Sequence, residues 1–224
     1  MAAGSRKTVR LKTPVRREDL ESLELGDVVY LDGYVYTARE GVYRRVLTEG
    51  HKLPAGLTDL TNVSFHCSPA ASVNEDGSYN IGAVTATASF RFGALIPAWF
   101  EASDCLLILG KGGMTEDDYR NVFVPRGARY LTTVGYGTGA LLGRGIKRVR
   151  EVHWLKELGI AQAIWVLEVE NFGPFLVDSD GEGRSLFEQH NKRLNQRIEG
   201  LYDGLKQPAL SRYGETDDRR EELI

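Results

Sequence analysis

Short apolar segments punctuated by glycine alternate with segments of helical spacing along most of the chain, and this alternation strongly constrains the fold. Residues 28–35 and 105–113 have the pattern of strands, with glycines at or beside their ends. Residues 39–50 and 185–205 carry apolar side chains at helical spacing. Strands and helices that alternate in this way pack in layers, because each element must bury its apolar face. We therefore predict an α/β domain.

Further elements follow from the same two periodicities. Strands are expected within residues 63–73, 130–134 and 163–180, and helices within residues 17–23 and 149–160. The N-terminal residues 1–17 are basic and are expected to form an arm, whereas residues 206–224 are polar and are expected to form a tail. The main domain should accordingly cover residues 18–205.

Composition excludes several classes of protein. The net charge is −3, which gives no bulk attraction to nucleic acid or to an anionic membrane. No apolar run approaches the roughly 20 residues that cross a bilayer. The basic N-terminus lacks the apolar segment of a secretory signal, so a cytoplasmic location is expected. With only two cysteines, Cys67 and Cys105, this chain cannot supply the three or four thiolates that iron–sulfur clusters usually take.

Three segments combine a basic side chain with small or hydroxyl residues at the boundary of a predicted element. Arg39 follows Thr37, Arg91 ends the run Thr85–Arg91, and Lys111 lies among the glycines of residues 110–113. Arginine binds a carboxylate with two parallel hydrogen bonds, and lysine supplies a compact charge. If these loops converge, they would bind a small dianion. The plainer interpretation is that both arginines are solvated surface residues.

Five blocks of sequence carry a resemblance to a known family. They are LELGDVVYLDGYVYTAREGVYRR (23–45), FHCSPA (65–70), TATASFRF (85–92), LGKGGM (109–114) and HWLKELGIAQAIWVLEVENFGPFLV (153–177). In this order the blocks resemble the beta subunit, or C-terminal domain, of class I fumarases and L-tartrate dehydratases. The resemblance covers roughly residues 18–190 and implies a layered "swivelling" β/β/α fold with a mixed sheet and flanking helices.

The resemblance also implies a function and a partner. In that family an alpha subunit or N-terminal domain holds a 4Fe-4S cluster through three cysteines, and the beta part closes over a small dicarboxylic acid. Carried over by motif, Arg39 and Arg91 would grip the substrate carboxylates, and Lys111 would add positive charge. Thr87 would be the catalytic base, with Ser89 among the substrate-binding residues. The chain would then be one subunit of a hetero-oligomeric hydro-lyase for fumarate and malate, or for a tartrate-like acid, and would bind no metal itself.

The chain departs from the family pattern in two places, and two other functions therefore stay open. Ala86 and Ala88 replace a proline and a threonine of the 85–92 loop, and Cys67-Ser68-Pro69 stands where the family has a Gly-Pro turn. A subunit that kept the fold but lost the chemistry would carry such changes. A dinucleotide-binding oxidoreductase domain is the second alternative, because residues 135–140 fit a loose G-x-G-x-x-A pattern. The plainer interpretation of that segment is a glycine-rich loop packed against a neighbour.

Overall fold

The computed structural model describes residues 6–135, 137–201 and 204. By contacts the chain divides into two compact units, residues 1–189 and residues 190–224. The strands are β1 (Thr8–Lys12), β2 (Val28–Thr37), β3 (Val63–Phe65), β4 (Cys67–Val73), β5 (Tyr79–Ala86), β6 (Leu107–Gly110), β7 (Arg129–Thr133), β8 (Ile146–His153) and β9 (Ile164–Val177).

The helical segments are short, apart from the last. They are α1 (Arg17–Glu21), α2 (Glu40–Tyr43), α3 (Leu57–Leu60), α4 (Ile96–Ser103), α5 (Glu116–Asp118), α6 (Val124–Arg126), α7 (Thr138–Arg144), α8 (Leu155–Leu158) and α9 (Leu186–Leu201). Two π-helical turns, η1 (Arg44–Thr48) and η3 (Tyr119–Phe123), extend α2 and α5, and the 3₁₀ helix η2 (Ser89–Leu95) leads into α4. None of the described helices is long and apolar enough to cross a membrane.

The main sheet is mixed, as predicted. Its described strands lie in the order β1-β2-β3-β6-β7-β9-β8, and β2 also pairs with β9. Strands β2, β3, β6 and β7 run parallel, whereas β9 runs antiparallel to β2, β7 and β8. The second pairing of β2 closes a ring through β3, β6, β7 and β9. The β4–β5 hairpin forms a separate two-stranded sheet.

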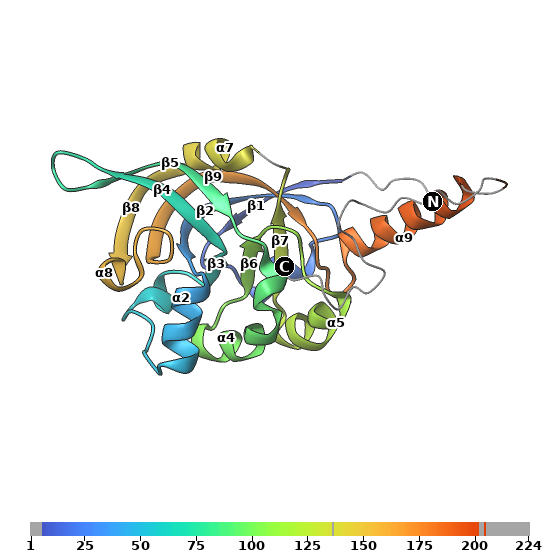
Figure 1. Ribbon diagram of the computed structural model, residues 1–224, viewed down its shortest axis with the longest axis horizontal. Coiled ribbons are helices and arrows are strands. Elements are labelled where there is room, and N and C mark those ends of the chain that lie inside the picture. Colours follow the sequence, from blue (N-terminus) through green and yellow to red (C-terminus); the bar gives the residue numbers. More distant parts are fainter. Residues whose placement is uncertain (1–5, 136, 202–203, 205–224) are drawn as a thin grey trace, which may run out of the picture. The chain divides into compact units, whose positions relative to one another are not determined.

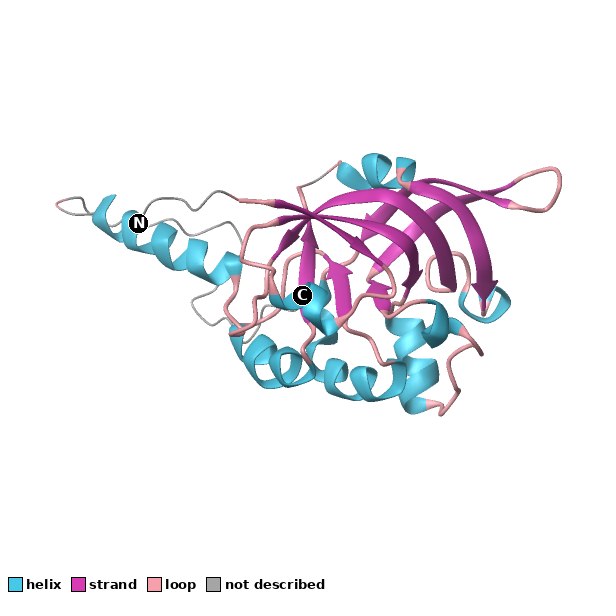
Figure 2. Ribbon diagram, turned by 180° about the vertical axis from the view of Figure 1, so that it is seen from behind, coloured by secondary structure: helices cyan, strands magenta, loops and turns pink. Residues whose placement is uncertain are grey.

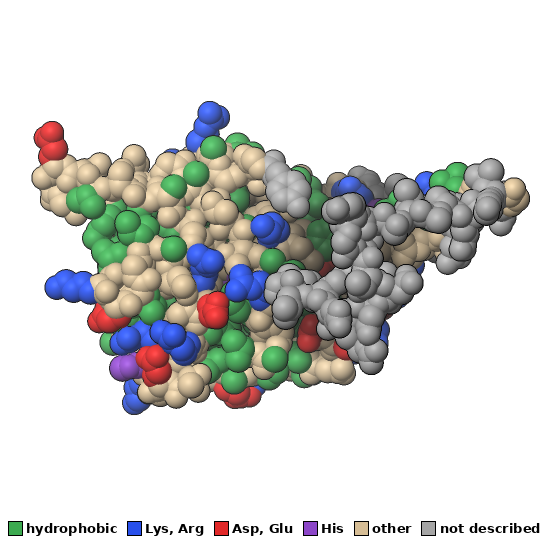
Figure 3. Space-filling view, in the orientation of Figure 1, with side chains coloured by type: hydrophobic (Ala, Val, Ile, Leu, Met, Phe, Trp, Pro, Cys, Tyr) green, Lys and Arg blue, Asp and Glu red, His purple; other side chains and the backbone are tan. Residues whose placement is uncertain are grey.

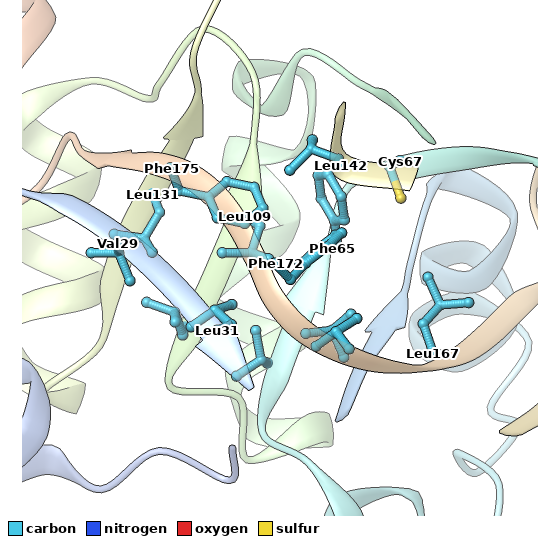
Figure 4. Packing of buried hydrophobic residues seen from close by; sticks show 14 of the residues in the cluster. Val29, Leu31, Phe65, Cys67, Leu109, Leu131, Leu142, Leu167, Phe172 and Phe175 are labelled. Atoms are coloured by element: carbon cyan, nitrogen blue, oxygen red, sulfur yellow. The ribbon is translucent and has the colours of Figure 1, made fainter. Parts of the chain in front are cut away.

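The main sheet separates two apolar cores, so the domain has three layers. Helices α2, α4 and α5 lie on one side, and α7 lies with the β4–β5 hairpin on the other (Figures 1 and 2). Strand alternation divides the side chains between the layers. Leu107 and Leu109 face the hairpin-side core, whereas Ile108 between them faces the helix-side core. Figure 4 shows the hairpin-side core, where Phe65 lies 5.9 Å from Phe172 between ring centroids. The predicted layered α/β class with flanking helices is confirmed.

Two of the predicted segments are wrong. Residues 8–12, assigned to the N-terminal arm, form β1, which pairs in parallel with residues 28–32 of β2. Residues 149–160, predicted as a helix, instead contain the end of β8 and the single turn α8. Register shifts in the pairing of β8 with β9 place its half-buried side chains about three residues apart, which imitates helical spacing. The predicted tail, residues 206–224, lies outside the described residues.

Candidate substrate site

The residues predicted to bind substrate follow the carboxyl ends of neighbouring parallel strands. Arg39 comes two residues after β2, and Lys111 follows β6 directly. Between these strands lies β3, which pairs in parallel with both and leads into His66. In α/β folds, with open sheets as with barrels, ligands bind outside the carboxyl ends of parallel strands. The fold therefore brings the backbones of Arg39 and Lys111, far apart in sequence, to one edge of the sheet.

The segment containing Thr87 is hydrogen-bonded to that same edge. The Thr87 amide donates to the carbonyl of His66 at 2.6 Å, and the Lys111 amide donates to the carbonyl of Thr87 at 3.2 Å. The Ser89 amide in turn donates to the carbonyl of Lys111 at 3.0 Å. Thr87 is 9% exposed, and its hydroxyl makes no hydrogen bond within the described part of the chain. The proposed base and the proposed lysine thus belong to one short ladder.

Arg39 is held at the start of α2 by two other segments. One terminal guanidinium nitrogen, Nη1, donates to Ser68 Oγ at 2.5 Å and to the carbonyl of Ala161 at 3.1 Å. The Arg39 Nε is buried and has no hydrogen-bond partner among the described residues. A buried donor without a partner is costly, and a bound acceptor would remove that cost. Arg39 is therefore half-buried and held in one orientation. It is not the solvated surface residue that the sequence left open as the alternative.

Arg91 lies in η2 and forms an ion pair with Glu40. The distance from Arg91 Nη2 to Glu40 Oε2 is 3.3 Å, and both side chains are largely exposed. Glu40 follows Arg39 directly, so this contact ties η2 to the segment that carries the other predicted arginine. Sequence reasoning did not identify Glu40, because an acid at the first position of a helix is common for its favourable effect at that end.

Lys111 lines a cavity of about 230 Å³ together with Thr85, Thr133 and Thr138. Its ammonium makes no ion pair or hydrogen bond with any other described residue, so its charge is available to a ligand. Thr85 is the register partner of Ser68 in the hairpin, and Ser68 is the residue that Arg39 contacts. The Ser68–Thr85 pair of the β4–β5 hairpin thus connects Arg39, which contacts Ser68, with the cavity that Thr85 and Lys111 line. Figure 3 shows basic side chains gathered next to acidic ones over the region where β5 ends and η2 begins.

Ser89 differs from the other predicted residues because its side chain points into the protein. It is fully buried, and its hydroxyl lies 2.8 Å from His66 Nδ1 and accepts a hydrogen bond from the Tyr130 hydroxyl at 2.7 Å. His66 Nε2 lies 2.8 Å from the Tyr43 hydroxyl. Burial lowers the pKa of His66 to about 3, so the ring is neutral. This burial argues against the predicted direct contact between Ser89 and substrate, and no spacing in the sequence pointed to His66.

Comparison with known proteins gives the family. The description "Fumarase C-terminus" belongs to the family model that matches residues 1–190. The chain belongs to this family. It is 34% identical to a putative L(+)-tartrate dehydratase subunit beta of Methanocaldococcus jannaschii, over 83% of this chain and 94% of the relative. It is 30% identical to the L(+)-tartrate dehydratase subunit beta of Escherichia coli K12, over 86% of this chain and 93% of the relative.

A longer relative shows the other arrangement of this family. The putative class I fumarate hydratase of Geobacillus stearothermophilus is 28% identical over 92% of this chain, but the match covers only 38% of that protein. This fumarase C-terminus domain therefore corresponds to a separate subunit in some relatives and to a part of a longer chain in another. The resemblance stated from the five sequence blocks is confirmed.

The residues of this fumarase C-terminus domain do not fit an iron–sulfur cluster. Both cysteines are buried, and neither is near a second thiol in sequence. Burial raises the pKa of the Cys105 thiol to about 12 and raises that of Cys67 further. Iron–sulfur clusters usually take three or four thiolates, whereas this domain has two thiols, and their burial disfavours the thiolate form. The described residues also contain no group of three or more His, Cys, Asp and Glu side chains arranged to hold a metal ion.

The glycine-rich segment of the domain packs against the hairpin. A Cβ added at Gly139 would lie 2.5 Å from the carbonyl oxygen of Val84, and one at Gly143 would lie 2.5 Å from that of Gly82. These two glycines form one face of α7 and allow it to approach β5 closely. After α7 the chain enters β8, which pairs antiparallel with β9. A dinucleotide-binding unit would require a parallel strand at that point, so the structure favours the packing interpretation.

Proposed function

We propose that this chain is the beta subunit of an iron–sulfur hydro-lyase that adds water to, or removes it from, a small dicarboxylic acid. Fumarate with malate, and a tartrate-like hydroxy acid, are the substrates that the names of the relatives suggest. The observation that carries the proposal is the ladder that fixes Thr87 against Lys111, at the same sheet edge as Arg39. A hetero-oligomer with an alpha subunit follows from the two relatives named as beta subunits.

The three cations would bind and orient a dianion. Arg39 and Arg91 are assigned to the two carboxylates, because a guanidinium can donate two parallel hydrogen bonds to each. Lys111 adds an unpaired charge beside the cavity that it lines. For Arg91 to bind substrate, its exposed ion pair with Glu40 must open, and exposed pairs of this kind are weak.

Thr87 is assigned to the proton transfer. Removing a proton from the carbon next to a carboxylate places negative charge beside existing negative charge, so fixed cations stabilise the transition state. A threonine hydroxyl is a poor base in water, and it needs a desolvated and positively charged setting. The 9% exposure of Thr87 meets the first condition, and its backbone ladder to Lys111 places it beside a residue that can meet the second. Ser89, whose hydroxyl is buried, receives a supporting role instead of a substrate contact.

The cluster is assigned to the partner, since this chain has two cysteines and both are buried. When bound, such a cluster would supply an iron that acts as a Lewis acid toward the substrate hydroxyl. The partner would also cover apolar surface beside the site. Phe90, next to Arg91, is 66% exposed, and Leu95 in the same 3₁₀ helix is 37% exposed. Obligate interfaces are apolar, so these side chains mark the expected docking region. The cytoplasmic location expected from the sequence stays a prediction.

The test is co-expression with a candidate alpha subunit, anaerobic purification, and a hydratase screen over small dicarboxylates. We expect this chain alone to be colourless and inactive, and the complex to be coloured and active. A stoichiometric cluster on the isolated chain would contradict the assignment of the cluster to the partner. A stable coloured complex that is inactive on every dicarboxylate would favour the alternative of a subunit that kept the fold but lost the chemistry.

A further inference from the structure

We propose that His66 is a positioning residue, which fixes the Thr87–Ser89 segment against Lys111 and thereby sets the geometry of the proposed base. The inference rests on the proposed function, but its structural part can be tested without activity. His66 touches no substrate in this scheme. It acts through two contacts with the segment, one from its backbone and one from its ring.

The backbone of His66 lies between the two segments whose relative position matters. Its amide donates to the carbonyl of Leu109 on β6 at 2.9 Å, and its carbonyl accepts from the Thr87 amide at 2.6 Å. One residue thus connects the strand that leads to Lys111 with the residue proposed as base. The backbone hydrogen bonds from Thr87 through Lys111 to Ser89 continue this series, so the 87–89 segment is bonded to both neighbouring segments.

The ring of His66 fixes the other end of the segment through Ser89. The Ser89 hydroxyl lies between His66 Nδ1 at 2.8 Å and the Tyr130 hydroxyl at 2.7 Å. Tyr43 holds the second ring nitrogen at 2.8 Å and itself stacks on Trp99 with 4.3 Å between ring centroids. All of these side chains are fully buried. A neutral imidazole has one donor and one acceptor, which matches one hydroxyl on each side.

Gly110 provides the space that this arrangement requires. A Cβ at residue 110 would lie 1.9 Å from Ser89 Oγ and 2.5 Å from the Tyr130 hydroxyl oxygen. The glycine immediately before Lys111 therefore allows the Ser89 hydroxyl to lie directly against β6. The sequence Gly110-Lys111 thus combines two functions, a place for the anchor of the 87–89 segment and a charge for the ligand.

The decisive comparison uses two buried serines in the complete alpha–beta complex. Ser89→Ala removes the side-chain anchor, whereas Ser103→Ala removes an equally buried hydroxyl that donates to the carbonyl of Trp99, at the end of α4. We expect both variants to lower the melting temperature. Only Ser89→Ala should lower kcat, by between about tenfold and a hundredfold, because small displacements of a catalytic group have effects of this size.

Two substitutions of His66 separate its two ring contacts. The amide of His66→Asn can reach the position of Nδ1 and keep a contact with Ser89, whereas the longer amide of His66→Gln reaches the position of Nε2 and keeps a contact with Tyr43. If the contact with Ser89 positions the segment, His66→Asn should retain more turnover than His66→Gln at equal folded fraction. The reverse order would overturn the proposal.

Hydrogen exchange, measured by mass spectrometry on the same complexes, separates this inference from the proposed function. We expect peptides covering residues 85–92 and 107–113 to exchange faster in Ser89→Ala and not in Ser103→Ala. This result would support the positioning role even if the wild-type complex hydrates no dicarboxylate, an outcome that would contradict only the proposed function. Unchanged exchange in these peptides, or equal losses of kcat in the two serine variants, would overturn the positioning role.

Discussion

The guanidinium of Arg39 and the hydroxyl of Ser68 are 2.5 Å apart, although Arg39 lies between β2 and α2 and Ser68 lies in the β4–β5 hairpin. The Ser68 hydroxyl donates to the carbonyl of Ala161 at 2.8 Å. The same carbonyl also accepts a hydrogen bond from Arg39. This triangle orients the arginine while its Nε stays buried and unpaired. An oriented arginine loses less side-chain entropy when it binds a carboxylate, so it contributes more to affinity than a mobile one.

Arg39→Lys should therefore raise KM by at least about tenfold, because an ammonium cannot replace a planar fork that makes two hydrogen bonds. Steady-state kinetics of the complex would measure this. The matched control is Arg148→Lys on β8, where an exposed arginine pairs with Glu168 at 2.6 Å and lies far along the chain from the site segments. Equal values of KM in the two variants would remove Arg39 from the substrate site.

Glu40→Gln should lower KM modestly, by up to about fivefold, since an exposed ion pair contributes little and can be displaced. The reason is that the Glu40 carboxylate, 3.3 Å from Arg91, competes with the substrate carboxylate for the same guanidinium. Arg91→Ala should instead raise KM. Steady-state kinetics would measure both KM values, and titration of the complex with a non-reacting dicarboxylate should shift the Kd in the same two directions. If Glu40→Gln weakens binding, the pair has a role other than competition.

Thr87→Ala should lower kcat by about 10² to 10⁴ and leave substrate affinity nearly unchanged, because a general base acts mainly in the transition state. Thr87→Ser keeps a hydroxyl and should recover much of the loss. Ser89→Ala should have a smaller effect than Thr87→Ala, since its hydroxyl acts only through position. Normal turnover in Thr87→Ala together with none in Ser89→Ala would show that the base has been assigned to the wrong residue. Normal turnover in both would place the proton acceptor on the partner.

The lowered pKa of His66 predicts that the folded protein loses stability in acid. Its folded pKa of about 3 lies below its ordinary value of 6.5, so the unfolded chain binds the proton more readily. This contribution is complete above pH 6.5 and is lost as the pH falls toward 3, by about 1.4 kcal/mol per pH unit. Urea unfolding at pH 7 and pH 5 would show it. His66→Asn has no such group, so its deficit relative to wild type should shrink by about 2 kcal/mol at pH 5. An equal deficit at both pH values would contradict the burial of a neutral imidazole.

Sequence patterns predicted a strand correctly where the segment's own residues determine that it forms a strand. The strand-like residues 28–35 and 105–113 lie within or around β2 and β6, and the backbones of Arg39 and Lys111 follow the carboxyl ends of these two strands. Residues 8–12 alternate polar and apolar side chains over only five positions, and the basic residues around them led to the interpretation as an arm. Their structure comes from pairing with β2, which is a contact between segments that no local pattern records.

What the sequence by itself determined is the layered α/β class, the identity of the cations and hydroxyls available for a dianion, and the shortage of thiols for a cluster. The tertiary structure decided which hydroxyl is hydrogen-bonded in the core and which has no hydrogen-bond partner among the described residues. Thr87 and Ser89 look equivalent in the run TATASFRF, yet only Ser89 is anchored on His66 and Tyr130. Local periodicity depends on neighbours along the chain, whereas the direction of a side chain in a loop depends on partners far away in sequence. The roles of three residues therefore depend on contacts between β3, β6 and β7, because these strands lead to or contain His66, Gly110 and Tyr130.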